Sequence, residues 1–82
     1  MCEENAGKVR ELVKELEYNL FLTEYMPSYR EVYLSRAEEI LAELEEMGVS
    51  HQEILETASE LFRDSEDSYL RVQLFLMEME EG

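Results

Sequence analysis

Basic residues are scarce in this sequence. Lysine and arginine together number 7, against 21 aspartates and glutamates, and the formal net charge is −14. A charge of this sign and size repels the phosphates of nucleic acids and the anionic surfaces of membranes. We therefore expect no direct binding to nucleic acid and no attachment to an acidic membrane surface.

Cysteine is almost absent, and long apolar runs are missing. The one cysteine, Cys2, cannot form an internal disulfide, which favours a reducing compartment. Residues 1–8 are polar and acidic and do not look like a signal peptide. No apolar run approaches the ~18 residues of a membrane-spanning helix. The sequence predicts a cytoplasmic protein that is neither secreted by a signal peptide nor embedded in a membrane.

Few side chains are suited to chemistry. The one histidine, His51, is predicted to lie exposed on the first turn of a helix. No glutamate precedes it by three residues, so the Glu-x-x-His motif of carboxylate-bridged metal sites is missing. Cys2 has no basic neighbour that would activate its thiol, and Gly7-Lys8 lacks the context of a phosphate-binding loop. We expect no catalytic residue, no metal, no cofactor and no enzyme activity.

Glycine and proline are also few, at 3 and 1, and no glycine- or serine-rich linker divides the chain. Apolar residues instead recur at helical spacing, and 82 residues suffice for one hydrophobic core. The pattern predicts an all-α fold, a small antiparallel bundle of three to four short helices in one acidic domain, 1–82. The expected helices cover about 6–25, 28–47, 51–63 and 66–80. Gly48 is placed as the left-handed residue that ends the second helix. The apolar stripe of the first helix consists of Val9, Leu12, Val13, Leu16 and Leu20.

Capping patterns mark two of the helix starts. Pro27 ends the first helix, and Ser28 followed by Glu31 has the spacing of a capping box. Ser50 and Glu53 repeat this spacing just before the third helix. We therefore predict a capping box at the start of both the second and the third helix.

The last segment has two possible periodicities. Leu70, Val72, Leu74 and Leu76 alternate as in a strand, but Tyr69, Val72, Leu76 and Met79 repeat as in a helix. A lone strand has no partner to pair with, so a helix is predicted. Leu70, Leu74 and Met77 then form a second apolar stripe, which indicates either a central position or a second contact surface. In the alternative architecture, three helices form the bundle and the C-terminal helix docks on a partner.

Negative charge is concentrated in the second half of the chain. Residues 1–36 contain 7 acids and 5 bases, whereas residues 37–82 contain 14 acids and 2 bases. Several glutamates of the second and third helices are spaced at i, i+3 or i+4, where like charges repel by a few tenths of a kcal/mol. This clustering is explained either by solubility or by attraction of a basic protein. The acidic candidates for partner binding are Glu38, Glu39, Glu43, Glu45, Glu46, Glu53, Glu56 and Glu60.

Tyrosines gather around the predicted turn between the first two helices. Their rings either close the base of the bundle, with hydroxyls in water, or contact a partner, since tyrosine and arginine are common at interfaces. Tyr29, Arg30 and Tyr33 therefore join the candidate partner-binding residues.

Two functional hypotheses follow. In the first, a non-enzymatic acidic module acts as an inhibitor or adaptor that occupies a basic surface of a protein that handles nucleic acid. In composition alone, the chain is similar to the small acidic inhibitors that viruses make against such host proteins, including anti-restriction and anti-CRISPR proteins, which would place it in the host cytoplasm. In the second, the first and fourth helices bury their extra apolar faces in a homodimer, and the acids serve solubility.

Overall fold

Four α-helices and one short 3-10 helix are present in residues 3–81, the part of the chain that the computed structural model describes. They are α1 (Glu3–Tyr25), η1 (Pro27–Tyr29), α2 (Arg30–Glu46), α3 (His51–Leu61) and α4 (Glu66–Glu81). No strand occurs among these residues, so the all-α fold and the helical prediction for the last segment are confirmed. Cys2 lies outside the described residues. Within them, no helix is long and apolar enough to cross a membrane.

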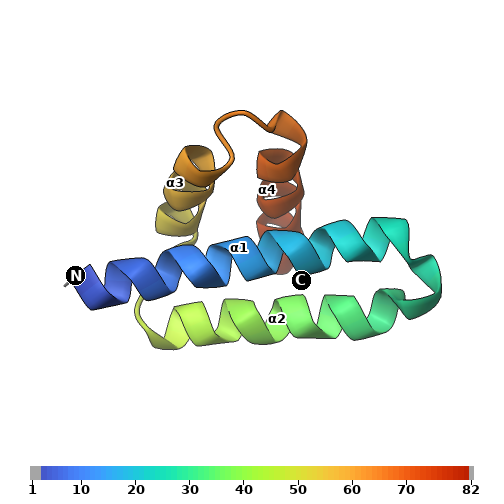
Figure 1. Ribbon diagram of the computed structural model, residues 1–82. Helices are drawn as coiled ribbons and strands as arrows, with labels where there is room; N and C mark the ends of the chain where they lie inside the picture. The colour runs from blue at the N-terminus through green and yellow to red at the C-terminus, as the bar shows by residue number, and fades with distance from the viewer. Residues whose placement is uncertain (1–2, 82) are drawn as a thin grey trace.

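The helices are arranged as two hairpins that cross. α1 and α2 run antiparallel and form the longer hairpin, and α3 and α4 form a shorter one that stands across α1 (Figure 1). The backbone of α1 packs against α2, α3 and α4, and α3 also packs against α4. No backbone position of α2 lies against α3 or α4. Helix α1 is therefore the common support of the fold.

The core lies where the apolar stripes of the helices meet on α1. All five residues of the predicted α1 stripe are buried, and each of the other helices contributes at least two buried side chains. Burying a Leu, Ile or Val side chain contributes about 1.5–3 kcal/mol, so this contact is the main favourable term in folding. The fully buried large side chains are Val13, Leu16, Ile40, Leu41, Leu44, Ile54, Val72 and Leu76.

The turn between α1 and α2 differs from the prediction. Ser28 lies inside the 3-10 helix η1, and the residue before α2 is Tyr29, which makes no side-chain cap. Pro27 starts this tight turn, in which the Tyr29 N–H donates to the Met26 carbonyl over 2.9 Å. Backbone carbonyls thus take the place that the Ser28 hydroxyl was expected to fill, and the predicted capping box at Ser28 is wrong.

The connection from α2 to α3 follows the sequence signals closely. Gly48 has a φ of +82°, a left-handed conformation that glycine adopts without strain. The Val49 N–H donates to the Leu44 carbonyl over 3.1 Å, and the Ser50 hydroxyl accepts from the Glu53 N–H over 3.1 Å. The Glu53 carboxylate in turn accepts from the Ser50 N–H. The predicted capping box at Ser50 is confirmed.

Helix α4 buries the middle of its first predicted stripe together with Phe75, and its second stripe faces outward. Val72, Phe75 and Leu76 are buried, and Phe75 was in neither predicted stripe. Leu70, Leu74 and Met77 are 39%, 57% and 49% exposed. Helix α4 therefore belongs to the fold but is not its central helix, and its second stripe faces outward.

The two capping patterns provide a matched test. Ser50→Ala removes a real cap and is expected to lower the free energy of unfolding by about 1 kcal/mol. Ser28→Ala removes the same hydroxyl from a turn that does not use it, and should change stability by less than about 0.5 kcal/mol. Urea unfolding followed by circular dichroism measures both. Equal losses for the two variants would contradict this assignment of the caps.

Candidate functional site

The eight candidate glutamates lie on two helices whose backbones are not adjacent. Five are on α2 and three on α3, and each of these helices turns its apolar stripe towards α1. In Figure 1, α2 and α3 lie on different sides of α1. Residues 37–62 are therefore not a packed hairpin with one acidic face, and their charges are spread over two surfaces.

Basic side chains offset three of these glutamates. Helix α1 supplies two of the cations: the Lys8 Nζ lies 3.4 Å from the Glu43 carboxylate, and an Arg10 nitrogen lies 3.4 Å from Glu60. Arg36 pairs with Glu39 over 3.3 Å on the same helix. All these side chains are at least 42% exposed, so each pair contributes at most about 1 kcal/mol.

His51 is placed differently from the prediction. Its side chain is only 23% exposed, because it lies between the ends of α2 and α4. The ring nitrogen Nδ1 lies 3.1 Å from a Glu80 oxygen, and Nε2 lies 3.5 Å from a Glu45 oxygen. Glu45 is therefore engaged within the fold, as is Glu53 through its capping box. The expectation of an exposed histidine failed because the last turn of α4 covers it.

Glu38, Glu46 and Glu56 are left without an ion pair among the described residues. All three are exposed. Glu56 accepts one hydrogen bond, over 3.4 Å from the Gln52 amide, and no cation offsets its charge. These three carboxylates are therefore the members of the candidate set that are most available to a basic partner.

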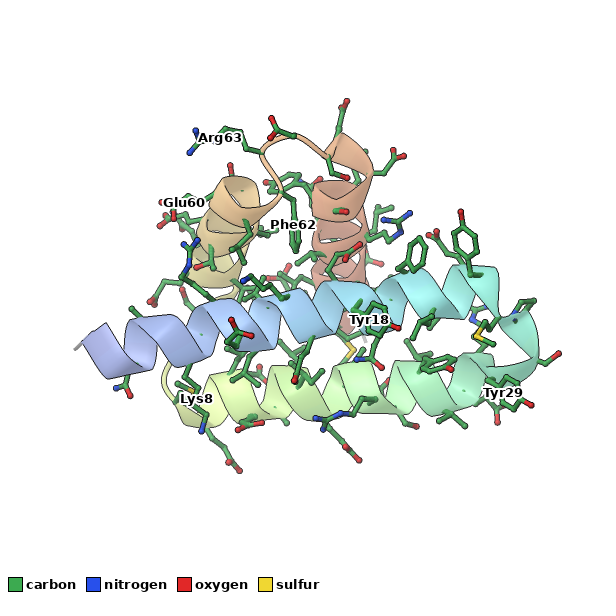
Figure 2. The ribbon with its side chains drawn as sticks, in the orientation of Figure 1. Lys8, Tyr18, Tyr29, Glu60, Phe62 and Arg63 are labelled. Atoms are coloured by element: carbon green, nitrogen blue, oxygen red, sulfur yellow. The ribbon has the colours of Figure 1, made fainter. Side chains whose placement is uncertain are left out.

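The aromatic candidates lie at the opposite end of α2. Tyr29 is 57% exposed, and Tyr33 is half-buried, with its hydroxyl 3.7 Å from the Met26 sulfur. Tyr18 and Tyr25 are 59% and 70% exposed, so these rings do not close the base of the fold. Because 17 residues of α-helix span about 25 Å, the aromatic end and the glutamates near residue 46 form separate surfaces. Figure 2 shows Tyr29 at the tip of the hairpin, far from Glu60.

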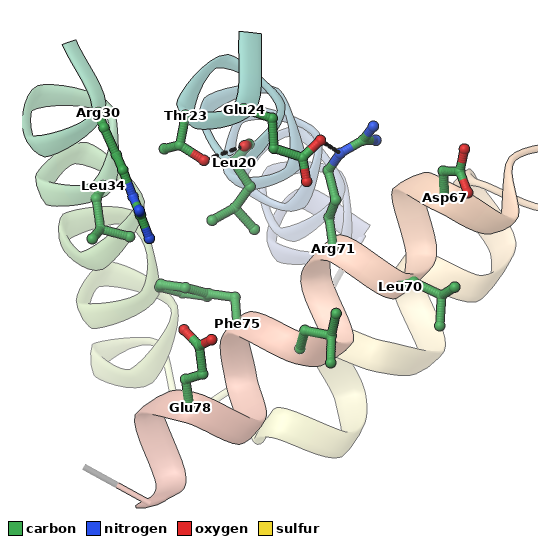
Figure 3. Close-up of a pocket in the computed structure, with 11 residues that line it drawn as sticks. Leu20, Thr23, Glu24, Arg30, Leu34, Asp67, Leu70, Arg71, Phe75 and Glu78 are labelled. Carbon is green, nitrogen blue, oxygen red and sulfur yellow. Dashed lines mark hydrogen bonds and ion pairs between the residues drawn. The ribbon is translucent and has the colours of Figure 1, made fainter. Parts of the chain in front are cut away.

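Arg30 lines a groove that the sequence did not reveal. This groove, of about 600 Å³, lies in the corner between α4 and the end of the α1–α2 hairpin. Figure 3 shows the Arg30 side chain extended from α2 towards Phe75 and Glu78 of α4. Arg30 is exposed and makes no ion pair in the described part of the chain. We call this feature the corner groove; it is lined by Leu20, Thr23, Glu24, Arg30, Leu34, Asp67, Leu70, Arg71, Leu74, Phe75 and Glu78.

One wall of the corner groove is held by Arg71. Its guanidinium lies 3.1 Å from both Glu17 and Glu24 of α1, and 5.1 Å from the centre of the Phe21 ring. Burial on its own lowers the pKa of Arg71, but the hydrogen bonds and charges of Glu24 and Glu17 outweigh it and raise that pKa above its ordinary value. Arg71 therefore stays charged and fixes α4 to α1.

The described residues offer no cluster of three or more His, Cys, Asp or Glu side chains with the geometry to hold a metal ion. No protein-family model matches the chain, and comparisons with curated proteins and with solved structures find no significant similarity. A functional reading therefore depends on the surfaces themselves, namely the uncompensated glutamates and the corner groove.

Arg71 provides a test of what holds the groove in shape. Arg71→Gln leaves Glu17, whose side chain is only 14% exposed, without its cation, and should lower the free energy of unfolding by about 2 kcal/mol. Arg36→Gln also removes two ion pairs, but exposed ones, and should cost less than about 0.5 kcal/mol. Chemical denaturation of both variants checks the difference. A loss for Arg71→Gln no larger than that for Arg36→Gln would contradict the structural role.

Proposed function

We propose that this chain is a non-enzymatic protein-binding module that occupies a basic surface of another protein. The observation that carries the proposal is the uneven compensation of charge. Lys8, Arg10 and Arg36 offset neighbouring glutamates, whereas Glu38, Glu46 and Glu56 have no cation beside them in the described structure. Solubility alone needs a net charge of only about 2–8 for a small domain, and −14 exceeds that range.

The proposed mechanism is steering followed by blocking. A surface with charge of one sign raises the rate of association with an oppositely charged partner by about 10–10³ at low salt. Once bound, an acidic domain covers the basic residues that the partner needs for its own ligand. An inhibitor and an adaptor share this first step, and they differ in whether the covered surface is the active one.

In its most specific form, the proposal makes the chain an inhibitor of a nucleic-acid-handling protein, a mimic of nucleic acid of the viral anti-defence or anti-CRISPR type. Duplex DNA as long as this molecule's longest dimension, 39 Å, carries about 23 charges. The net charge of −14 is about three fifths of that. Mimicry would therefore need the acids of several helices together, and affinity for the partner should fall steeply with salt.

The charged surface can be tested by reversal. Immobilised protein is incubated with a lysate of its source cells at about 50 and 300 mM salt, and bound proteins are identified by mass spectrometry. A basic protein should bind at the lower salt and be released at the higher one. The double variant Glu38→Lys, Glu46→Lys should no longer capture this basic protein.

The matched control for this test is Asp64→Lys with Glu81→Lys. It makes the same change in net charge at two exposed residues of the α3–α4 turn and the α4 end. This variant should still capture the partner. Equal capture by the two variants, or capture that does not depend on salt, would contradict the proposed acidic surface.

The exposed stripe of α4 favours a second candidate, a homodimer. Leu70, Leu74 and Met77 would be buried against a second copy. However, α4 contains five acids and one arginine, so two copies would bring like charges together. Sedimentation at high micromolar concentration should therefore show a monomer at about 150 mM salt. A stable dimer under those conditions would favour the self-associating subunit over the binding module.

A further inference from the structure

The exposed large apolar side chains form two groups. One group surrounds the α1–α2 turn, and the other lies on the outer face of α4. Arg71 of α4 contacts Glu17 and Glu24, which places α4 beside the second half of α1, near that turn. The members are Tyr18, Tyr25, Met26, Tyr29 and Val32 in the first group, and Leu70, Leu74, Met77 and Met79 in the second. Of these side chains, Leu70 and Leu74 line the corner groove.

The shape of the corner groove suits a helix. Its apolar lining comes from three elements: Leu20 of α1, Leu34 of α2, and Leu70, Leu74 and Phe75 of α4. Leu70 and Leu74 are one helical turn apart on α4, and both are exposed. An amphipathic helix binds such a groove by placing its own i, i+4 and i+7 residues between these side chains.

The charges around the groove favour a basic segment as its occupant. Asp67 and Glu78 are the two carboxylates of the lining that have no ion pair in the described structure, because Glu24 is engaged by Arg71. Arg30 is the one cation of the lining that has no ion pair among residues 3–81. A second copy of this chain would bring five more acids on its own α4. A segment rich in lysine and arginine fits this charge, whereas a second copy does not.

We propose that the corner groove binds a basic amphipathic helix of the partner protein. The apolar stripe of that helix packs on Leu34, Leu70 and Leu74, and its lysines and arginines meet Asp67 and Glu78. Arg30 donates to carbonyl oxygens at the end of the bound helix. This inference rests on the proposed function for the basic character of the partner, but it assigns the apolar contact to residues other than Glu38, Glu46 and Glu56.

The probe for this site is a synthetic helix of leucine and lysine, about five turns long, with leucine at i, i+3, i+4 and i+7. A second peptide of the same composition alternates the two residues and has no apolar helical stripe. Each is titrated into isotope-labelled protein, and the shifts of amide and methyl NMR signals map the contact. The amphipathic peptide should shift signals of residues 20–34 and 67–78, and should bind at least about tenfold more tightly than the alternating one.

Variants separate the groove from the acidic surface. The double variant Leu70→Ser, Leu74→Ser should lower the affinity for the amphipathic peptide by about tenfold, because two apolar contacts with the peptide are lost. Both positions are exposed, so the fold does not depend on them. Val32→Ser removes an apolar side chain that is 64% exposed but lies outside the groove lining, and should change the affinity by less than about twofold. Circular dichroism confirms that each variant is folded.

Three outcomes bear on the two proposals differently. Groove shifts that depend on Leu70 and Leu74 support the inference. Shifts confined to the surfaces around Glu38, Glu46 and Glu56, equal for both peptides, would overturn it and leave the proposed function standing. If neither peptide binds at about 50 mM salt, both proposals are contradicted.

Discussion

Packing of three helices on one apolar stripe of α1 is the interaction on which the rest of the structure depends. Val13 and Leu16 at the centre of that stripe are fully buried, and α2, α3 and α4 all pack on α1. The helices differ in length, however: α1 has 23 residues and α3 only 11. The α3–α4 hairpin also stands across α1 rather than along it, so it covers only part of the longer hairpin (Figure 1). The corner groove and the exposed rings around Tyr25 and Tyr29 are consequences of this mismatch.

The charges of the molecule are also unevenly compensated. Cations of α1 and Arg36 offset part of the acidity of α2 and α3, and Arg71 is used to hold α4 to α1. What remains are the exposed carboxylates of Glu38 and Glu46 on α2 and of Glu56 on α3, and a groove lined by apolar side chains, three acids and two arginines. Such a separation suits binding in two steps, since charges act over about a Debye length and apolar side chains act only in contact.

Local signals in the sequence predicted most of the fold. The Ser50 capping box, the left-handed Gly48 and the α1 stripe each depend on residues within about five positions of one another, and all three are confirmed. Ser28 has the same spacing as Ser50, but Pro27 draws it into a 3-10 turn. His51 and the corner groove depend on where α4 lies in space, which no spacing along the chain encodes. The second α4 stripe, Leu70, Leu74 and Met77, was visible in the sequence, but that it faces solvent depends on where α4 lies in the fold.

Binding kinetics of the leucine–lysine helix test the central claim, that the acidic surface attracts a basic partner and the corner groove holds it. Stopped-flow fluorescence with a labelled peptide separates association from dissociation. The account predicts that reversing Glu38 and Glu46 slows association and flattens its salt dependence, and that replacing Leu70 and Leu74 by serine mainly speeds dissociation. Both variants changing the same rate constant to the same extent would contradict a division of roles between the two surfaces.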